Sequence, residues 1–271
     1  MILNEAIVKS KNLDNIDGYF DDLQTHYKAS MSTDKDLSKI AKSLKKEFNL
    51  DCEIDIVEDD SKFYGMRVYP SQEEIKKMAI VIIDKDNEGL QFESCKEVVI
   101  EIDSKLIDMA TPREMTAVLI HEVGHKAVNS KESQNLKKLV VAEMAIAGIV
   151  TIPLMLIGAF IMMISLLLTV AFAYPTLLLL KNKVESDADS LSVKYGYGDS
   201  LWTFINKIDK NLVIDEKQDN KRLVKFSLER AIHFGVRKNE IRKNILEEIK
   251  VSKSPYEKEV LENQLKVLNR K

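Results

Sequence analysis

His121-Glu122-Val123-Gly124-His125 is the stretch on which the interpretation of this chain depends, because it holds two of the four histidines, four residues apart. On a helix this spacing places both imidazoles on one face, one turn apart, where they can bind a single metal ion. Glu122 follows the first histidine and points to the side, where it can reach a metal-bound water without coordinating the metal. The pattern is short enough to arise by chance, so its surroundings must support it.

The residues around this motif predict that it lies on a helix. Thr111, Pro112 and Glu114 have the spacing of a helix start, with threonine as the N-cap, proline in the first helical position and glutamate three residues after the cap. Apolar residues then recur at intervals of three and four and predict one buried helix face: Met115, Val118, Leu119, Val123 and Ala127. The motif therefore has the setting that metal binding by both histidines requires.

Composition limits the class of protein. At 271 residues the chain can form one large domain or two small ones, and its formal charge of −3 with interspersed acids and bases gives no sign of a nucleic-acid partner. Cys52 and Cys95 are far apart, so we expect neither a disulfide framework nor cysteine metal ligands. Residues 1–10 include Glu5 and have no continuous apolar core, which does not resemble a signal peptide.

The first 103 residues change character near residue 50. Residues 1–50 are predicted to be helical and amphipathic, with an apolar stripe that we expect to be packing surface: Leu37, Ile40, Ala41, Leu44 and Phe48. Short segments rich in β-branched residues then predict a small antiparallel sheet: Cys52–Val57, Phe63–Tyr69, Met78–Ile83 and Glu97–Ile102. In many zinc peptidases an edge strand beside the metal-binding helix pairs with the extended substrate, and by analogy alone Glu97–Ile102 is the candidate for such a strand here.

A second strong feature is the absence of any charged residue from Met144 to Leu180. A membrane-spanning helix needs about 20 apolar residues, so this stretch is too long for one crossing and just long enough for two short ones. A re-entrant segment, or a helix pair buried in a large soluble assembly, remains an alternative. Beyond it, periodicity predicts helices at 184–195, 199–210, 219–234, 238–250 and 255–269, with Asp199, Asp219 and Ser254 near their starts.

These patterns predict four regions. They are an N-terminal helical region (1–50), a region with the sheet and the motif helix (51–138), a hydrophobic hairpin that is transmembrane or re-entrant (139–181), and a C-terminal helical region (182–271). The predicted fold class is α+β.

A catalytic zinc site needs a third protein ligand and an open position for water. The remaining histidines, His26 and His233, are distant in sequence, so the candidates are Glu143 and Glu185. Glu185 is favoured because Asp189 shares its helix face and can accept the free ring N–H of a ligand histidine. The alternative is that Glu185 and Asp189 are a solvated acidic helix start.

His121-Glu122-Val123-Gly124-His125, a long hydrophobic insertion and Glu185-Ser186-Asp187-Ala188-Asp189 together resemble the membrane gluzincins. These are the HtpX-type heat-shock proteases and the CAAX prenyl proteases. The resemblance covers about residues 97–195. It implies a zincin-like catalytic domain with an inserted hairpin, a zinc cofactor, hydrolysis of peptide bonds in protein or peptide substrates, and a lipid bilayer close to the active site. HtpX-type proteins usually have membrane spans before the first motif, and this chain shows none there.

The flanks of the apolar stretch give an independent prediction of topology. Basic residues precede it (Lys126, Lys131, Lys137 and Lys138) and follow it (Lys181 and Lys183). The positive-inside rule then places both flanks, and the active site, in the cytoplasm. An even number of crossings is also what would let His125 and Glu185 bind one metal.

The expected chemistry is that of a zinc endopeptidase with Glu122 as general base, and with His233 or Tyr195 as weaker candidates for a donor to the oxyanion. A different class of function is also compatible with the sequence. The chain could be a structural or membrane-inserting component of a larger assembly, for example viral or secretory, with a stabilising or vestigial metal site. A homo-oligomer is compatible with either class.

Overall fold

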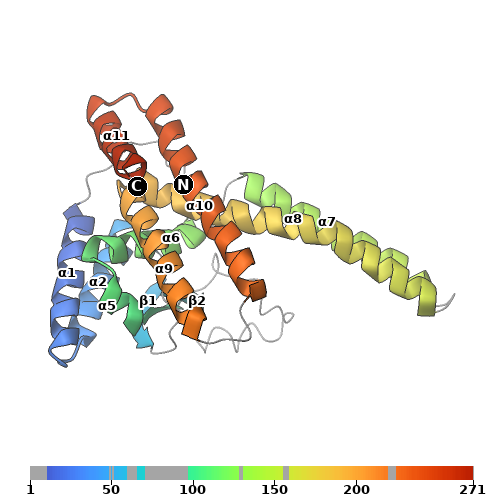
Figure 1. The fold of residues 1–271 in the computed structure, drawn as a ribbon, viewed down its shortest axis with the longest axis horizontal. Coiled ribbons are helices and arrows are strands. Elements are labelled where there is room, and N and C mark those ends of the chain that lie inside the picture. The colour runs from blue at the N-terminus through green and yellow to red at the C-terminus, as the bar shows by residue number, and fades with distance from the viewer. Residues whose placement is uncertain are drawn as a thin grey trace. The chain divides into compact units, whose positions relative to one another are not determined.

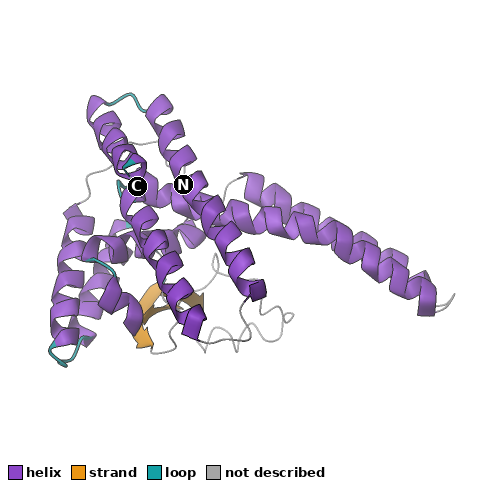
Figure 2. Cartoon of the chain, viewed as in Figure 1, coloured by secondary structure: helices purple, strands orange, loops and turns teal. Residues whose placement is uncertain are grey.

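The computed structural model describes residues 11–48, 50, 52–59, 66–70, 97–127, 131–154, 159–218 and 224–270. Its described elements are mostly helices, with one small sheet, which fits the predicted α+β class (Figure 2). Contacts divide the chain into two compact units, a main unit of residues 1–127 and 188–271 and a second unit of residues 128–187.

The N-terminal helices α1 (Lys11–Lys28) and α2 (Asp34–Glu47) pack against each other in the main unit (Figure 1). The five residues of the predicted apolar stripe on α2 and just after it are all buried, so their role as packing surface is confirmed. Gln24 of α1 donates hydrogen bonds from Nε2 to the carbonyls of Ile107 (2.7 Å) and Ala110 (2.6 Å). These bonds tie α1 to the segment that leads into the motif helix.

The described sheet has three strands: β1 (Glu53–Asp59), β2 (Met66–Pro70) and β3 (Glu97–Asp103). Their order is β1-β3-β2, with β1 parallel and β2 antiparallel to β3, so the prediction of a wholly antiparallel sheet is wrong. The choice of Glu97–Ile102 as an edge strand is also wrong, because β3 lies between the other two strands. Alternation in sequence shows which face of a strand is buried, but not its partners or their direction. The predicted strand Met78–Ile83 lies outside the described residues.

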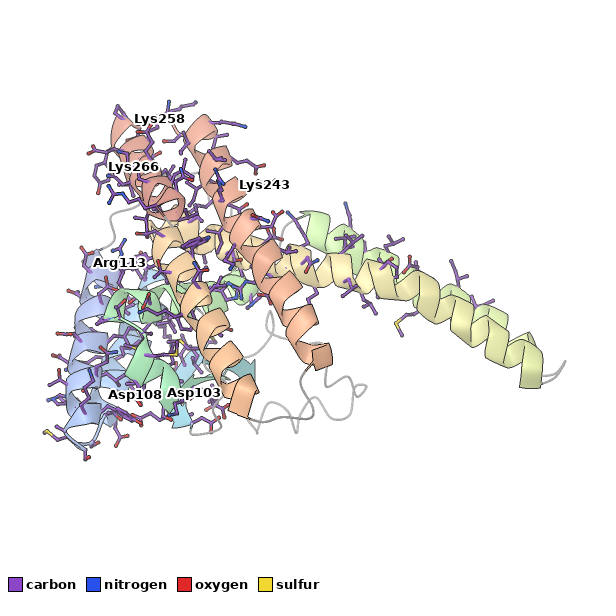
Figure 3. All side chains as sticks on the ribbon, viewed as in Figure 1. Asp103, Asp108, Arg113, Lys243, Lys258 and Lys266 are labelled. Atoms are coloured by element: carbon purple, nitrogen blue, oxygen red, sulfur yellow. The ribbon has the colours of Figure 1, made fainter. Side chains whose placement is uncertain are left out.

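The chain passes from β3 through two capped helices to the motif. Asp103, which is labelled in Figure 3, caps α5 (Ser104–Met109). It accepts a 2.7 Å hydrogen bond from the backbone N–H of Lys105. The motif helix α6 (Pro112–Ala127) begins with the predicted capping box, which is confirmed. The N–H of Thr111 donates to Glu114 Oε2 (2.8 Å), and the N–H of Glu114 donates to Thr111 Oγ1 (3.3 Å).

Among the described residues of the main unit, three further helices follow: α9 (Gly198–Gln218), α10 (Val224–Val251) and α11 (Pro255–Asn269). α10 is one helix where the sequence predicts two, because a single glycine such as Gly235 costs a helix only about 1 kcal/mol. Ser254 caps α11 as expected, whereas Asp219 lies outside the described residues. Arg113, labelled in Figure 3, lies near the start of α6. It donates to the carbonyl of Gly196 (2.8 Å) and to Ser200 Oγ (3.1 Å), and these bonds hold the turn between α8 and α9 against α6.

The second unit contains α7 (Lys131–Leu154) and most of α8 (Ala159–Lys194), which lie side by side (Figure 1). Thr176 Oγ1 of α8 donates to Glu143 Oε1 of α7 at 3.0 Å. In the part of the chain that the structure describes, no helix is both long and apolar enough to cross a membrane. The predicted transmembrane spans within 139–181 are therefore not supported, and the side chains of 151–174 lie outside the description.

Candidate metal centre

The candidate metal centre combines residues of α6 and α8. One side-chain ligand atom each from His121, His125 and Glu185 lies within 4.8 Å of the other two. The two imidazole centroids are 4.7 Å apart with their planes at 79°, as expected for histidines one turn apart on a helix. His121 is buried, whereas His125 and Glu185 are partly exposed, which leaves the group accessible to solvent on one side.

A close approach of the two helices accounts for this grouping. A Cβ atom built on Gly124 would lie 2.8 Å from Ala188 Cα, 3.0 Å from its carbonyl oxygen and 3.1 Å from its Cβ. Only glycine at 124 and a small residue at 188 permit this separation of the two backbones. Gly124 immediately precedes His125, and Ala188 immediately precedes Asp189, so the crossing sets the metal-ligating residues against the acidic residues of α8.

Asp189 contacts His121 at the ring nitrogen Nδ1. Its Oδ1 lies 2.8 Å from His121 Nδ1, and the carboxylate is fully buried. This contact leaves Nε2 of His121 as the nitrogen available to a metal, because Nδ1 is the donor to the carboxylate. Burial alone would raise the pKa of Asp189, but Arg237 and His121 outweigh burial and hold that pKa below its usual range. The carboxylate is therefore ionised at neutral pH and can accept the proton of Nδ1.

Arg237 of α10 also contacts Asp189 and His121, and the sequence analysis did not identify it. Its Nη2 lies 2.7 Å from Asp189 Oδ1, and its Nε lies 3.3 Å from Asp189 Oδ2. The same Nη2 lies 3.3 Å from both ring nitrogens of His121. No local pattern marks Arg237, because it is separated by 48 residues from Asp189 and by 116 from His121.

The remaining candidates differ in where the structure places them. Glu122 lies on α6 and is half-buried. Glu143 lies on α7, where it accepts a hydrogen bond from Thr176, and it is not part of the group of metal ligands.

The tyrosine and the other histidines lie in different surroundings. Burial raises the pKa of Tyr195, whose ring packs on Phe48 with centroids 5.1 Å apart. His26 Nδ1 lies 2.5 Å from Asp36 Oδ2 in the contact between α1 and α2. His233 lies in α10, but its side chain is outside the description.

The donor set suits a catalytic zinc ion. Two imidazoles and one carboxylate are the three ligands of many catalytic zinc sites, in which the fourth position is left for water. The carboxylate behind His121 is the second-shell acceptor that such histidines usually have. The residues present therefore fit a divalent metal of this kind.

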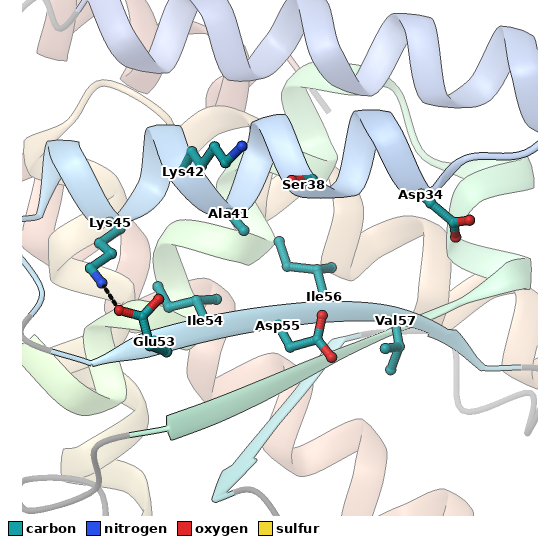
Figure 4. Close-up of a pocket in the computed structure, with 10 residues that line it drawn as sticks. All are labelled: Asp34, Ser38, Ala41, Lys42, Lys45, Glu53, Ile54, Asp55, Ile56 and Val57. Carbon is teal, nitrogen blue, oxygen red and sulfur yellow. Dashed lines mark hydrogen bonds and ion pairs between the residues drawn. The ribbon is translucent and has the colours of Figure 1, made fainter.

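The main unit also contains a separate groove. It has a volume of about 400 Å³ and is lined by one face of α2 and by successive residues of β1 (Figure 4). Lys45 and Glu53 form an ion pair across it. The residues that line it include no member of the metal group, so the groove is distinct from the candidate metal centre.

Comparison with known proteins adds a finding that agrees with this geometry. Residues 89–203 match the model of peptidase family M48. The match contains all three candidate metal ligands and Asp189, and it supports a metallopeptidase of this family. It covers less than half of the 271 residues, and α1, α2, α10 and α11 lie outside it. No curated protein and no solved structure matches the chain.

Proposed function

We propose that this protein is a zinc-dependent endopeptidase that hydrolyses peptide bonds in protein or peptide substrates. The observation that carries the proposal is the grouping of His121, His125 and Glu185, with Asp189 in contact with His121. The match to peptidase family M48 supports the same reaction class. The finer assignment to the HtpX-type or CAAX prenyl proteases is part of the proposal and rests on the motif pair with its long apolar insertion.

The three ligands would hold zinc, which supplies a Lewis acid and lowers the pKa of water at the site toward ~7. Asp189 keeps His121 in the tautomer that presents Nε2. Glu122 accepts a proton from the attacking water and later transfers it to the nitrogen of the leaving amine. Glu122 can do so because it stands between the two histidines in sequence and lies to the side of the face that they share.

The developing oxyanion needs a hydrogen-bond donor in addition to the metal. We retain His233 for this role. It precedes Arg237 by one helical turn in α10, and Arg237 contacts both Asp189 and His121. Tyr195 is less suitable because its ring packs against Phe48. Replacing His233 with alanine should lower kcat by about 10²-fold or more while zinc content is unchanged.

The test of the reaction is the Glu122→Gln variant, assayed for zinc content and for cleavage of a general protein substrate such as casein. Removing a general base should lower the rate by about 10²–10⁴-fold, whereas zinc content should stay at the wild-type level. Glu247→Gln, at an exposed position of α10, is the matched control and should behave as wild type. Undiminished cleavage by Glu122→Gln would refute the mechanism.

We also propose that the second unit associates with a lipid bilayer and that the active site is on the cytoplasmic side. The support is an apolar surface on the described parts of α7 and α8, where large apolar side chains are exposed: Leu139, Val141, Met144, Ile146, Ile149, Leu177, Leu178 and Leu179. The basic residues that flank the apolar stretch favour the cytoplasmic side.

The same surface would suit the alternative function, a component of a larger assembly with a stabilising metal site. Purification separates the two. A membrane-associated peptidase should need detergent, and fractionation of cells should recover it with membranes. Recovery of a detergent-free, metal-binding oligomer with no peptidase activity would favour the assembly.

A further inference from the structure

We propose that Arg237 is a positioning residue of the metal centre, which holds Asp189 in the orientation that accepts the proton of His121 Nδ1. Through Arg237, helix α10 becomes part of the site. The inference rests on the proposed metal site but goes beyond it, because Arg237 lies 34 positions after the last residue of the family match, residue 203.

The first step in the argument is the geometry of Asp189 and Arg237. Two nitrogens of the guanidinium approach the two carboxylate oxygens, at 2.7 Å for Nη2 to Oδ1 and 3.3 Å for Nε to Oδ2. A planar fork of this kind fixes the plane of a carboxylate as well as its charge. The oxygen that makes the shorter contact, Oδ1, is also the one 2.8 Å from His121 Nδ1. The plane that Arg237 fixes is therefore the plane in which His121 is bound.

The second step is the burial of Asp189. Its side chain has 0% relative exposure, and that of Arg237 has 14%. A buried carboxylate that loses its cation is strongly destabilised, and it rotates or draws in water to recover a partner. Either response would move Oδ1 away from Nδ1, so His121 would lose the acceptor that fixes its tautomer and its ring orientation.

The third step is the direct contact with His121. Nη2 of Arg237 is equidistant from the two ring nitrogens, at 3.3 Å, and Nδ1 already donates to Asp189. An atom placed in this way packs against the imidazole and does not form a straight hydrogen bond to either nitrogen. Arg237 thus limits rotation of the ring that would carry one metal ligand. The contact of Arg237 with Asp189 and its contact with His121 should therefore both affect zinc affinity. An ion pair elsewhere in the core would leave zinc affinity unchanged.

The test measures zinc affinity by competition with a chromophoric chelator, using the full chain and confirming the folded fraction by circular dichroism. Arg237→Gln should bind zinc about 10–100-fold more weakly than wild type, which is the usual effect of losing a second-shell partner. Arg237→Lys should recover part of this loss, since an ammonium group restores the charge but cannot bridge both oxygens. Arg242→Gln, at an exposed position of the same helix, is the matched control and should stay within twofold.

A double variant keeps the test decisive if Arg237→Gln alone does not fold. Asp189→Asn with Arg237→Gln removes the buried carboxylate charge together with its cation. The zinc affinity of the double variant should lie close to that of Asp189→Asn alone, because Arg237 acts mainly through Asp189. Wild-type zinc affinity in a folded Arg237→Gln protein would overturn the inference, as would simple additivity of the two losses. Failure of the wild-type protein to bind zinc would instead overturn the proposed function.

Discussion

Replacing Gly124 with alanine tests whether the crossing of α6 and α8 assembles the metal centre. The added Cβ would lie 2.8 Å from the Cα of Ala188, which is a backbone atom and cannot turn aside as a flexible side chain could. To restore an ordinary carbon contact of 3.4 Å, the two helices would have to separate by about 0.6 Å at this point.

The expected loss follows from two opposing effects. Overpacking of this kind costs about 1–3 kcal/mol, and contact with backbone places this site at the upper end of that range. Alanine improves helix propensity over glycine by about 1 kcal/mol, so the free energy of unfolding should fall by roughly 2 kcal/mol. A separation of this size also exceeds the tolerance of about 0.5 Å within which a binding site must be held, so zinc affinity should fall about tenfold or more.

The chain provides a matched control in Gly18, a glycine of α1 whose added Cβ would meet nothing within 4 Å. Gly18→Ala should stabilise the protein by about 0.4–1 kcal/mol and leave zinc affinity unchanged. Both variants would be measured by urea denaturation and by zinc titration against a competing chelator. A Gly124→Ala protein that is as stable as Gly18→Ala and binds zinc as wild type does would refute the close crossing.

Three further predictions concern the elements that support the site. Thr111→Ala removes the N-cap of α6 and should lower the free energy of unfolding by about 1 kcal/mol in urea titrations, whereas Thr25→Ala, at an exposed hydroxyl of α1, should change it by less than half as much. Gln264→Ala leaves the buried N–H of Gly198 without its 2.8 Å acceptor and should lower the same free energy by about 1–3 kcal/mol; an unchanged denaturation midpoint would contradict this. Burial raises the pKa of Asp36, but the hydrogen bonds from His26 and Lys39 outweigh burial and hold that pKa below its usual range. Its stabilising effect should therefore be complete above the unfolded-state pKa of about 3.9 and be lost as pH falls through the lower folded-state pKa, so Asp36→Asn should flatten the acid side of a plot of stability against pH.

The features that the sequence predicted best are those that depend on local spacing. The capping box of Thr111 and Glu114 and the apolar stripe of α2 involve residues within a few turns of one another, and both are present as expected. The pairing of Glu185 with Asp189 was also proposed from a spacing of one turn. To predict that Glu185 lies close to His121 and His125, one must also assume that the chain returns to the motif helix after the apolar stretch.

The features that were missed or wrong depend on contacts between distant segments. Arg237 meets Asp189 and His121 only because α10 packs near α6 and α8, and nothing around residue 237 marks that contact. The position of β3 between β1 and β2 was wrong for a similar reason, since alternation within a strand carries no information about its neighbours. Gly124 gave no signal as a lone helical glycine, and its role is visible only from its distance to Ala188.

The central claim, that His121, His125 and Glu185 form one metal centre, is tested most directly by measuring zinc bound per protein in three samples: wild type, Glu185→Ala and Glu143→Ala. The account predicts about one zinc per chain in wild type and in Glu143→Ala, and loss of zinc in Glu185→Ala. Full zinc in Glu185→Ala together with loss of zinc in Glu143→Ala would contradict it.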